Sequence, residues 1–166
     1  MQITQIELFK YAIPMVPFTI ATGTMHFAQN LLVCVHTNDG LVGWGESSAF
    51  PMIVGETQAT CFEVGKEFSA IWKGKDPLDL GARLAELDLC IARNYTAKSA
   101  FDLALHDLAA KAANQPLYAY LGGKTKAIES DLTIGIGTPA AMAEQAIDFV
   151  NNRGVNTIKV KLGKDP

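Results

Sequence analysis

This chain of 166 residues lacks several features that mark specialised classes of protein. Charged residues make up 19% of it, its net charge is −3, and it contains no dense run of lysine or arginine. Without a basic surplus, binding to nucleic acid or to an anionic membrane surface is not expected. No apolar run is long enough to cross a bilayer, and the N-terminus has no secretory-signal pattern. We therefore expect a cytoplasmic protein with no membrane or nucleic-acid partner.

Cysteine is also scarce. Cys34, Cys61 and Cys90 are odd in number and match no metal-ligand spacing, so we interpret them as free, buried thiols in a reducing compartment. The run Gly135-Ile136-Gly137 lacks the continuation that a dinucleotide-binding loop needs. Apolar residues, in contrast, make up 49% of the chain, which is enough to build a packed core.

The first fifty residues predict an antiparallel meander. Asp39-Gly40 favours a tight turn, and strands are expected at residues 3–13, 31–36 and 41–46. Two segments interrupt this pattern, Pro17–Gln29 and Ser47–Gly55, and we interpret both as mobile loops.

Helical periodicity then takes over. Helices are expected at residues 56–72, 77–91, 96–113 and 116–121. The strongest, 96–113, carries apolar residues at i, i+3, i+4 and i+7 over four turns, and its alanine-rich side favours close packing. Gly43 and Gly45 are expected to permit close backbone approach, with Trp44 between them in the core. The first part of the chain is therefore of the α+β class.

The sequence pattern changes in the last forty residues. A strand at 131–136, a helix at 140–152 and a strand at 155–162 follow one another with short links, which predicts a right-handed βαβ unit with parallel strands. The helix is expected to turn Ala143, Ile147 and Val150 inward. A single βαβ unit cannot cover both faces of a parallel sheet. We therefore expect either that the chain is part of a longer protein or that a partner supplies the rest of the sheet and its cover.

The last strand carries a lysine pair, Lys159 and Lys161, in a run that is otherwise mostly apolar or β-branched. Residues at i and i+2 of a strand project to the same side. Neighbouring ammonium groups on a mostly buried strand disfavour the charged form, so we expect the pKa of at least one of them to be lowered. A lysine that is partly neutral can act as a base near neutral pH.

Five segments, in this order and spacing, resemble the enolase superfamily in its muconate-lactonizing-enzyme subgroup, and most of all its dipeptide epimerases related to L-Ala-D/L-Glu epimerase. They are Gly43–Glu46 (GWGE), Ala97–Leu108 (AKSAFDLALHDL), Pro116–Tyr118 (PLY), Leu121–Gly123 (LGG) and Lys159–Lys161 (KVK). The resemblance implies a capping domain over residues 1–127. It also implies that residues 128–166 begin a (β/α) barrel of the TIM type, which ends here after its second strand.

The resemblance also implies a reaction. Lys161 would be the acid/base at the α-carbon of a dipeptide, and Lys159 would lower its pKa and contact the substrate carboxylate. An enediolate would form, stabilised by Mg²⁺, a chemistry that this superfamily is known for. The Mg²⁺ ligands and a second lysine are expected on barrel strands absent from this chain, so this segment alone is expected to be inactive. We assign no metal ligand within it, since Glu46, Asp131 and Asp165 show no convergent spacing.

Substrate choice is implied for the two segments interpreted as loops and for the first barrel strand. The residues expected to bind the substrate are Phe18, Gly23, Thr24, Ile53 and Thr133. Related Ala-Glu epimerases carry an arginine near the position of Gly23, whereas His26 is the only basic residue in these two segments. We therefore expect a dipeptide with an apolar or uncharged second residue as the small-molecule partner, and a homo-oligomer in the full-length form.

Other members of the same superfamily remain open as alternatives: N-acylamino acid racemase, o-succinylbenzoate synthase and muconate cycloisomerase. A different class is open as well, because the chain could be a cap-like binding or assembly module without catalysis.

Overall fold

The computed structural model describes residues 1–163, so Asp165 lies outside the described residues. The chain forms two compact units. The first combines Met1–Ile13 with Ala28–Thr125, and the second combines Pro14–Phe27 with the segment from Lys126 onward. The second unit therefore contains residues 14–27, which we call the hairpin tip. A domain boundary placed once, after residue 127, would assign these residues to the first unit instead.

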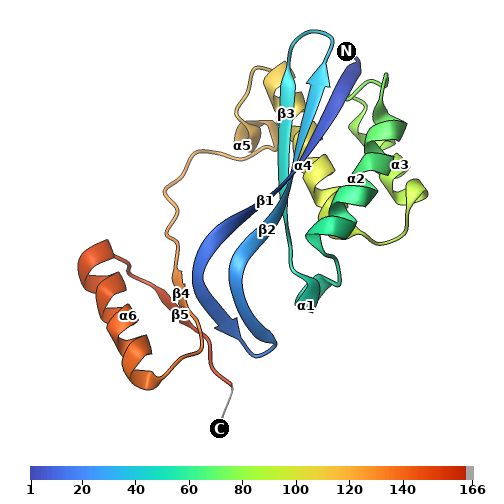
Figure 1. Cartoon of the computed structure of the whole chain (residues 1–166). Helices are drawn as coiled ribbons and strands as arrows, with labels where there is room; N and C mark the ends of the chain where they lie inside the picture. Colours follow the sequence, from blue (N-terminus) through green and yellow to red (C-terminus); the bar gives the residue numbers. More distant parts are fainter. Residues whose placement is uncertain (164–166) are drawn as a thin grey trace. The chain divides into compact units, whose positions relative to one another are not determined.

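Three strands form one sheet in the order β1-β2-β3 (Figure 1). They are β1 (Ile3–Ile20), β2 (Gly23–Thr37) and β3 (Val42–Ala49). The antiparallel meander is confirmed, but the prediction that Pro17–Gln29 is a loop was wrong. Strand β1 runs through Pro14 and Pro17, because it lies at the edge of the sheet, where a missing backbone N–H leaves no pairing unmet.

The second predicted loop, Ser47–Gly55, is also wrong as a loop. Its first three residues continue β3, and Pro51–Val54 form the short helix α1. Proline is suited to the first turn of a helix, and Gly55 ends this one with a left-handed backbone, at φ 76°.

The helices of the first unit follow the predicted order: α2 (Gln58–Trp72), α3 (Leu80–Cys90), α4 (Tyr95–Ala112) and α5 (Leu117–Tyr120). Helix α4 packs on β3. A Cβ at Gly43 would lie 2.9 Å from the Leu108 Cβ, and one at Gly45 would lie 2.6 Å from the Ala104 nitrogen. The two glycines therefore let helix and strand approach closely, as predicted. Trp44 was predicted in the core, but its side chain points to the other face and is 49% exposed.

An aromatic cluster fills the core beside this contact. The ring of Phe101 on α4 makes edge-to-face contacts with Phe68 and Trp72 on α2, both with centroids 5.2 Å apart. All three residues are fully buried. Such pairs contribute roughly 0.5–1.5 kcal/mol beyond the burial of their area.

Helix α4 is capped from a distance. Its own N-cap residue, Asn94, makes no side-chain cap hydrogen bond. Instead the buried carboxylate of Glu56, which precedes α2, accepts hydrogen bonds from the backbone N–H groups of Thr96 (3.1 Å) and Ala97 (3.3 Å). A negative charge at a helix N-terminus is favourable because it meets the positive end of the helix dipole.

The free edge of β3 is covered by an ion pair of α4. The Asp107 carboxylate accepts a hydrogen bond from the Trp44 N–H at 2.8 Å, and the Lys111 amine donates to the Val42 carbonyl at 2.8 Å. Asp107 and Lys111 also pair with each other, at 2.7 Å. The outward main-chain groups of the two strand residues are thereby satisfied.

In the second unit β4 (Leu132–Ile134), α6 (Pro139–Arg153) and β5 (Ile158–Val160) follow one another, and β4 and β5 pair in parallel. The predicted βαβ unit is confirmed. Thr138 caps α6 by accepting from the Ala141 N–H, and Gly154 ends the helix in a left-handed conformation.

The predicted inward side of α6 was wrong. Ala143, Ile147 and Val150 are exposed, with Ile147 at 59%, while Met142 and Phe149 are half-buried. Both sides of the helix carry apolar residues three and four positions apart, so periodicity alone could not choose between them. Strand β5 was likewise expected to be mostly buried, but Lys159 and Val160 are exposed.

Within residues 1–163, no helix combines the length and the apolar composition needed to span a membrane.

The cysteines lead to a prediction. Cys34 and Cys61 are buried as predicted, but the prediction was wrong for Cys90, which is exposed at the end of α3. Burial raises the pKa of both buried thiols to about 11, helped by Glu7 beside Cys34 and by Glu56 beside Cys61. Since the thiolate is the reactive form, iodoacetamide at pH 8 should label Cys90 alone in the native protein and all three after denaturation. Mass spectrometry of the peptides measures this, and native labelling of Cys34 or Cys61 at a comparable rate would contradict it.

Candidate functional site

The lysine pair sits at the end of the parallel strands. Lys159 on β5 is in register with Thr133 on β4, and the Lys161 N–H continues the pairing by donating to the Ile134 carbonyl at 3.0 Å. The pKa of Lys161 is lowered, first by the charge of Lys159, then by a hydrogen-bonding contact with it, and then by partial desolvation. Residues at i and i+2 of extended backbone project to the same side, which explains how the charge of Lys159 acts on Lys161.

The hairpin tip contains three of the residues expected to bind a substrate. Phe18 and Thr133 line the same cavity of about 200 Å³, which is closed on its other side by α6. The hydroxyls of Thr24 and Thr19 are hydrogen-bonded across the turn at 2.9 Å. Gly23 opens β2 directly after this turn. The structure thus places Phe18 with Thr133, and ties Thr24 to its own hairpin.

Ile53, the remaining expected residue, lies on α1 of the first unit, where its side chain is 60% exposed.

One contact between the hairpin tip and β4 was not predicted. The Ile136 N–H, two residues after the end of β4, donates to the carbonyl oxygen of Thr19 at 3.0 Å. Only main-chain groups take part, so the side-chain pattern gave no signal for it.

No magnesium site is formed by the residues that the structure describes. Within residues 1–163, no group of three or more His, Cys, Asp or Glu side chains could hold a metal ion. The Glu46 carboxylate is engaged elsewhere, since it accepts hydrogen bonds from the Tyr11 hydroxyl and the Asn30 amide. The Gln58 amide stiffens this cluster by donating to the carbonyls of Tyr11 and Asn30, at 2.7 and 2.8 Å. Glu46 therefore holds strands together.

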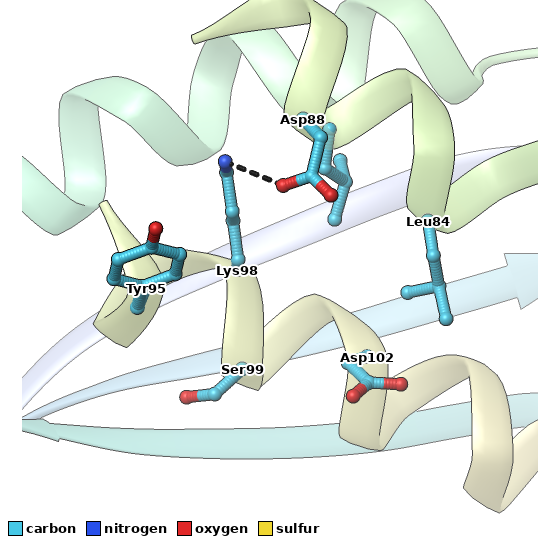
Figure 2. Close-up of a pocket in the computed structure, with 7 residues that line it drawn as sticks. Leu84, Asp88, Tyr95, Lys98, Ser99 and Asp102 are labelled. Atoms are coloured by element: carbon cyan, nitrogen blue, oxygen red, sulfur yellow. Dashed lines mark hydrogen bonds and ion pairs between the residues drawn. The ribbon is translucent and has the colours of Figure 1, made fainter. Parts of the chain in front are cut away.

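Another cavity, of about 350 Å³, lies between α3 and α4 in the first unit (Figure 2). The Lys98 amine at its edge is paired with Asp88 at 2.8 Å, and the Tyr95 ring lies 5.5 Å from that amine. Leu84 and Leu87 give it an apolar floor. It contains none of the seven residues expected for the site.

Two similar proteins and one similar crystal structure are informative. The D-Ala-D/L-Ala epimerase of Cytophaga hutchinsonii is 42% identical over 98% of this chain and 45% of its own length. A crystal structure of dipeptide epimerase from the same organism, in complex with Mg and the dipeptide D-Ala-L-Val, has a TM-score of 0.96 at 41% identity, over 99% of this chain and 45% of that one. The L-Ala-D/L-Glu epimerase of Bacillus subtilis is 32% identical, over 99% of this chain and 45% of its own length.

The chain thus spans a little under half the length of these relatives. The family described as mandelate racemase / muconate lactonizing enzyme, N-terminal domain, matches residues 3–122, which hold the meander and helices α1 to α5. The resemblance noted in the sequence is confirmed at this level, and the chain belongs to the mandelate racemase / muconate lactonizing enzyme family of the enolase superfamily, with dipeptide epimerases among its relatives.

Proposed function

We propose that this chain is the N-terminal part of an enzyme that epimerises dipeptides by removing and returning the proton on an α-carbon. The observation that carries the proposal is the lysine pair, with the pKa of Lys161 lowered by the neighbouring charge of Lys159. The pair follows a capping domain of the family, on a chain similar to dipeptide epimerases. In this proposal residues 1–127 form the cap and residues 128–166 begin the barrel.

The chemical role proposed for each lysine follows from its charge. Lys161 in its neutral form accepts the α-proton from one face of the carbon. Epimerisation then needs a proton delivered to the opposite face, which is the role proposed for a second lysine outside this chain. Lys159 stays close enough to keep the neutral form of Lys161 populated, and its own positive charge attracts the substrate carboxylate. An enediolate is the species that such proton removal leaves on the substrate.

A metal ion would supply stabilisation of the charge that develops on the carboxylate. The similar crystal structure contains Mg, but the described residues of this chain do not form a site for it. Its ligands therefore belong to other residues of the enzyme that we propose.

The proposed substrate has an apolar or uncharged second residue. The hairpin tip contains no lysine or arginine that could pair with a glutamate side chain, and Phe18 lines the cavity next to Thr133. One similar protein from Cytophaga hutchinsonii is a D-Ala-D/L-Ala epimerase, and the similar crystal structure from that organism contains the dipeptide D-Ala-L-Val. Both observations support a small or apolar side chain at that position.

Incorporation of solvent deuterium tests the function. The full-length gene product should exchange the α-proton of Ala-Ala and Ala-Val faster than that of Ala-Glu, as measured by NMR in D₂O. Removal of Mg²⁺ with EDTA should abolish the exchange, and added Mg²⁺ should restore it. The polypeptide of residues 1–166, assayed alone, should show none.

Each of these measurements can overturn a separate part of the proposal. A preference for Ala-Glu would contradict the substrate class, and turnover by residues 1–166 alone would contradict the view that essential groups lie elsewhere. If the full-length protein exchanges no dipeptide proton, the dipeptide epimerase proposal fails, and the alternatives are then another reaction of the superfamily or a non-catalytic binding module.

A further inference from the structure

We infer that Gly135 is a positioning residue, which seats the hairpin tip on β4 and so sets the shape of the cavity that Phe18 and Thr133 line; this inference rests on the proposed function. The seat is the hydrogen bond from the Ile136 N–H to the Thr19 carbonyl, at 3.0 Å. Both groups belong to the second unit. The bond joins the middle of the hairpin tip to the first residues after a strand that carries Thr133.

Position 135 is glycine because the main chain of Thr19 leaves too little space for a side chain. A Cβ there would lie 3.1 Å from the Thr19 nitrogen and 3.3 Å from the Thr19 oxygen, both main-chain atoms. It would also lie 3.5 Å from Cδ2 of the Phe18 ring. Gly135 is not among the residues with a positive φ, so no left-handed conformation demands glycine at this position. Any larger residue must push the hairpin tip away from β4 by a few tenths of an ångström.

The hairpin tip would move as a unit because its two strands are linked. The Thr19 and Thr24 hydroxyls are bonded across the turn, so displacing Thr19 displaces Thr24. Phe18, whose ring lies over Gly135, shares its cavity with Thr133. Thr133 in turn is in register with Lys159 on the neighbouring strand. Gly135 therefore controls the distance between the residues proposed to select the substrate and the strands that carry the base.

For the proposed reaction, the hairpin tip would affect how well the substrate fits. A shift of the hairpin tip changes the space for the second residue of the dipeptide, but it leaves both lysines on their own strand. Positional errors of this kind weaken binding and alignment. We expect KM to change more than kcat.

The test compares G135A with G137A in the full-length protein. Gly137 is a matched control, since it lies two residues further along the same segment and a Cβ there would meet only Met142 Cγ, at an ordinary 3.6 Å. Hydrogen exchange of the Ile136 amide, followed by mass spectrometry, reports the seat without any need for activity. Amide exchange in G135A should be about tenfold faster than in wild type or G137A, and KM for Ala-Val should rise about fivefold with kcat within about twofold.

The outcomes separate this inference from the proposed function. Equal exchange rates of the Ile136 amide in G135A and G137A would contradict the claim that Gly135 seats the hairpin tip on β4, whatever the activity. Faster exchange with an unchanged KM in an active enzyme would overturn the positioning role. A wild-type protein that turns over no dipeptide contradicts the proposed function instead, a result seen before any variant is made. T19V provides a second variant: it removes the hydroxyl bond to Thr24 but keeps the Thr19 carbonyl, so exchange should rise in the hairpin tip while Ile136 stays protected.

Discussion

Replacing Gly45 by alanine should unfold the first unit or lower its free energy of unfolding by about 3 kcal/mol or more. The added Cβ would overlap the Ala100 carbonyl oxygen and lie 2.6 Å from the Ala104 nitrogen. Both are main-chain atoms of α4, so no side-chain rotation can relieve the contact. The helix must instead lift from β3, which would open the contacts that Phe101 makes with Phe68 and Trp72.

Urea denaturation followed by circular dichroism measures this loss, and G81A is its matched control. Gly81 is exposed near the start of α3, and a Cβ there would meet nothing within 4 Å. The control should change the free energy of unfolding by at most about 1 kcal/mol, in the stabilising direction. Equal stabilities for G45A and G81A would show that α4 does not approach β3 as closely as described here.

The second large effect is expected at Lys161. If it is the base, K161A should lower the rate of α-proton exchange by about a thousandfold, the range that general acid–base catalysis contributes. The Lys161 residue is only half-buried and lies beyond the end of β5, so the free energy of unfolding should stay within about 0.5 kcal/mol of wild type. K73A, which removes an exposed lysine at the end of α2, should keep the wild-type rate. Exchange by K161A at a rate close to that of K73A would remove Lys161 from the proposed mechanism.

The role of Lys159 can be separated from that of Lys161 through pH. The base must be neutral, so kcat/KM should rise with pH through the pKa of Lys161 in the free enzyme. Lys159 lowers that pKa, and K159M should therefore move the rising limb to higher pH, because a positive neighbour is lost. An unmoved limb in an active K159M enzyme would contradict the coupling of the two amines.

Much of the first unit could be predicted because local pattern and burial agree there. The apolar spacing along α4 reflects a helix with one buried side. Gly43 and Gly45 indicated a close backbone approach, and the structure shows that α4 is the element that approaches. Pro14 and Pro17, in contrast, suggested the end of a strand. Their missing N–H groups do no harm at an edge, and whether a strand lies at an edge depends on the order of the sheet.

The site was only partly visible in the sequence. The lysine pair could be found because two equal charges at i and i+2 of an apolar strand are unusual and must share a side. The seat of the hairpin tip could not, since it joins the main chains of Thr19 and Ile136, far apart in the sequence. The burial of α6 was also misjudged, because Ile147 and Phe149 are both apolar and their exposure depends on what packs against the helix.

The ion pair of Asp107 and Lys111 has a consequence for self-association. By occupying the Trp44 N–H and the Val42 carbonyl, it leaves an incoming extended peptide no free ladder at this point of β3, so the sheet stops growing at three strands. Fibril-like stacking through this edge of β3 would first require Asp107 to release the Trp44 N–H and Lys111 to release the Val42 carbonyl.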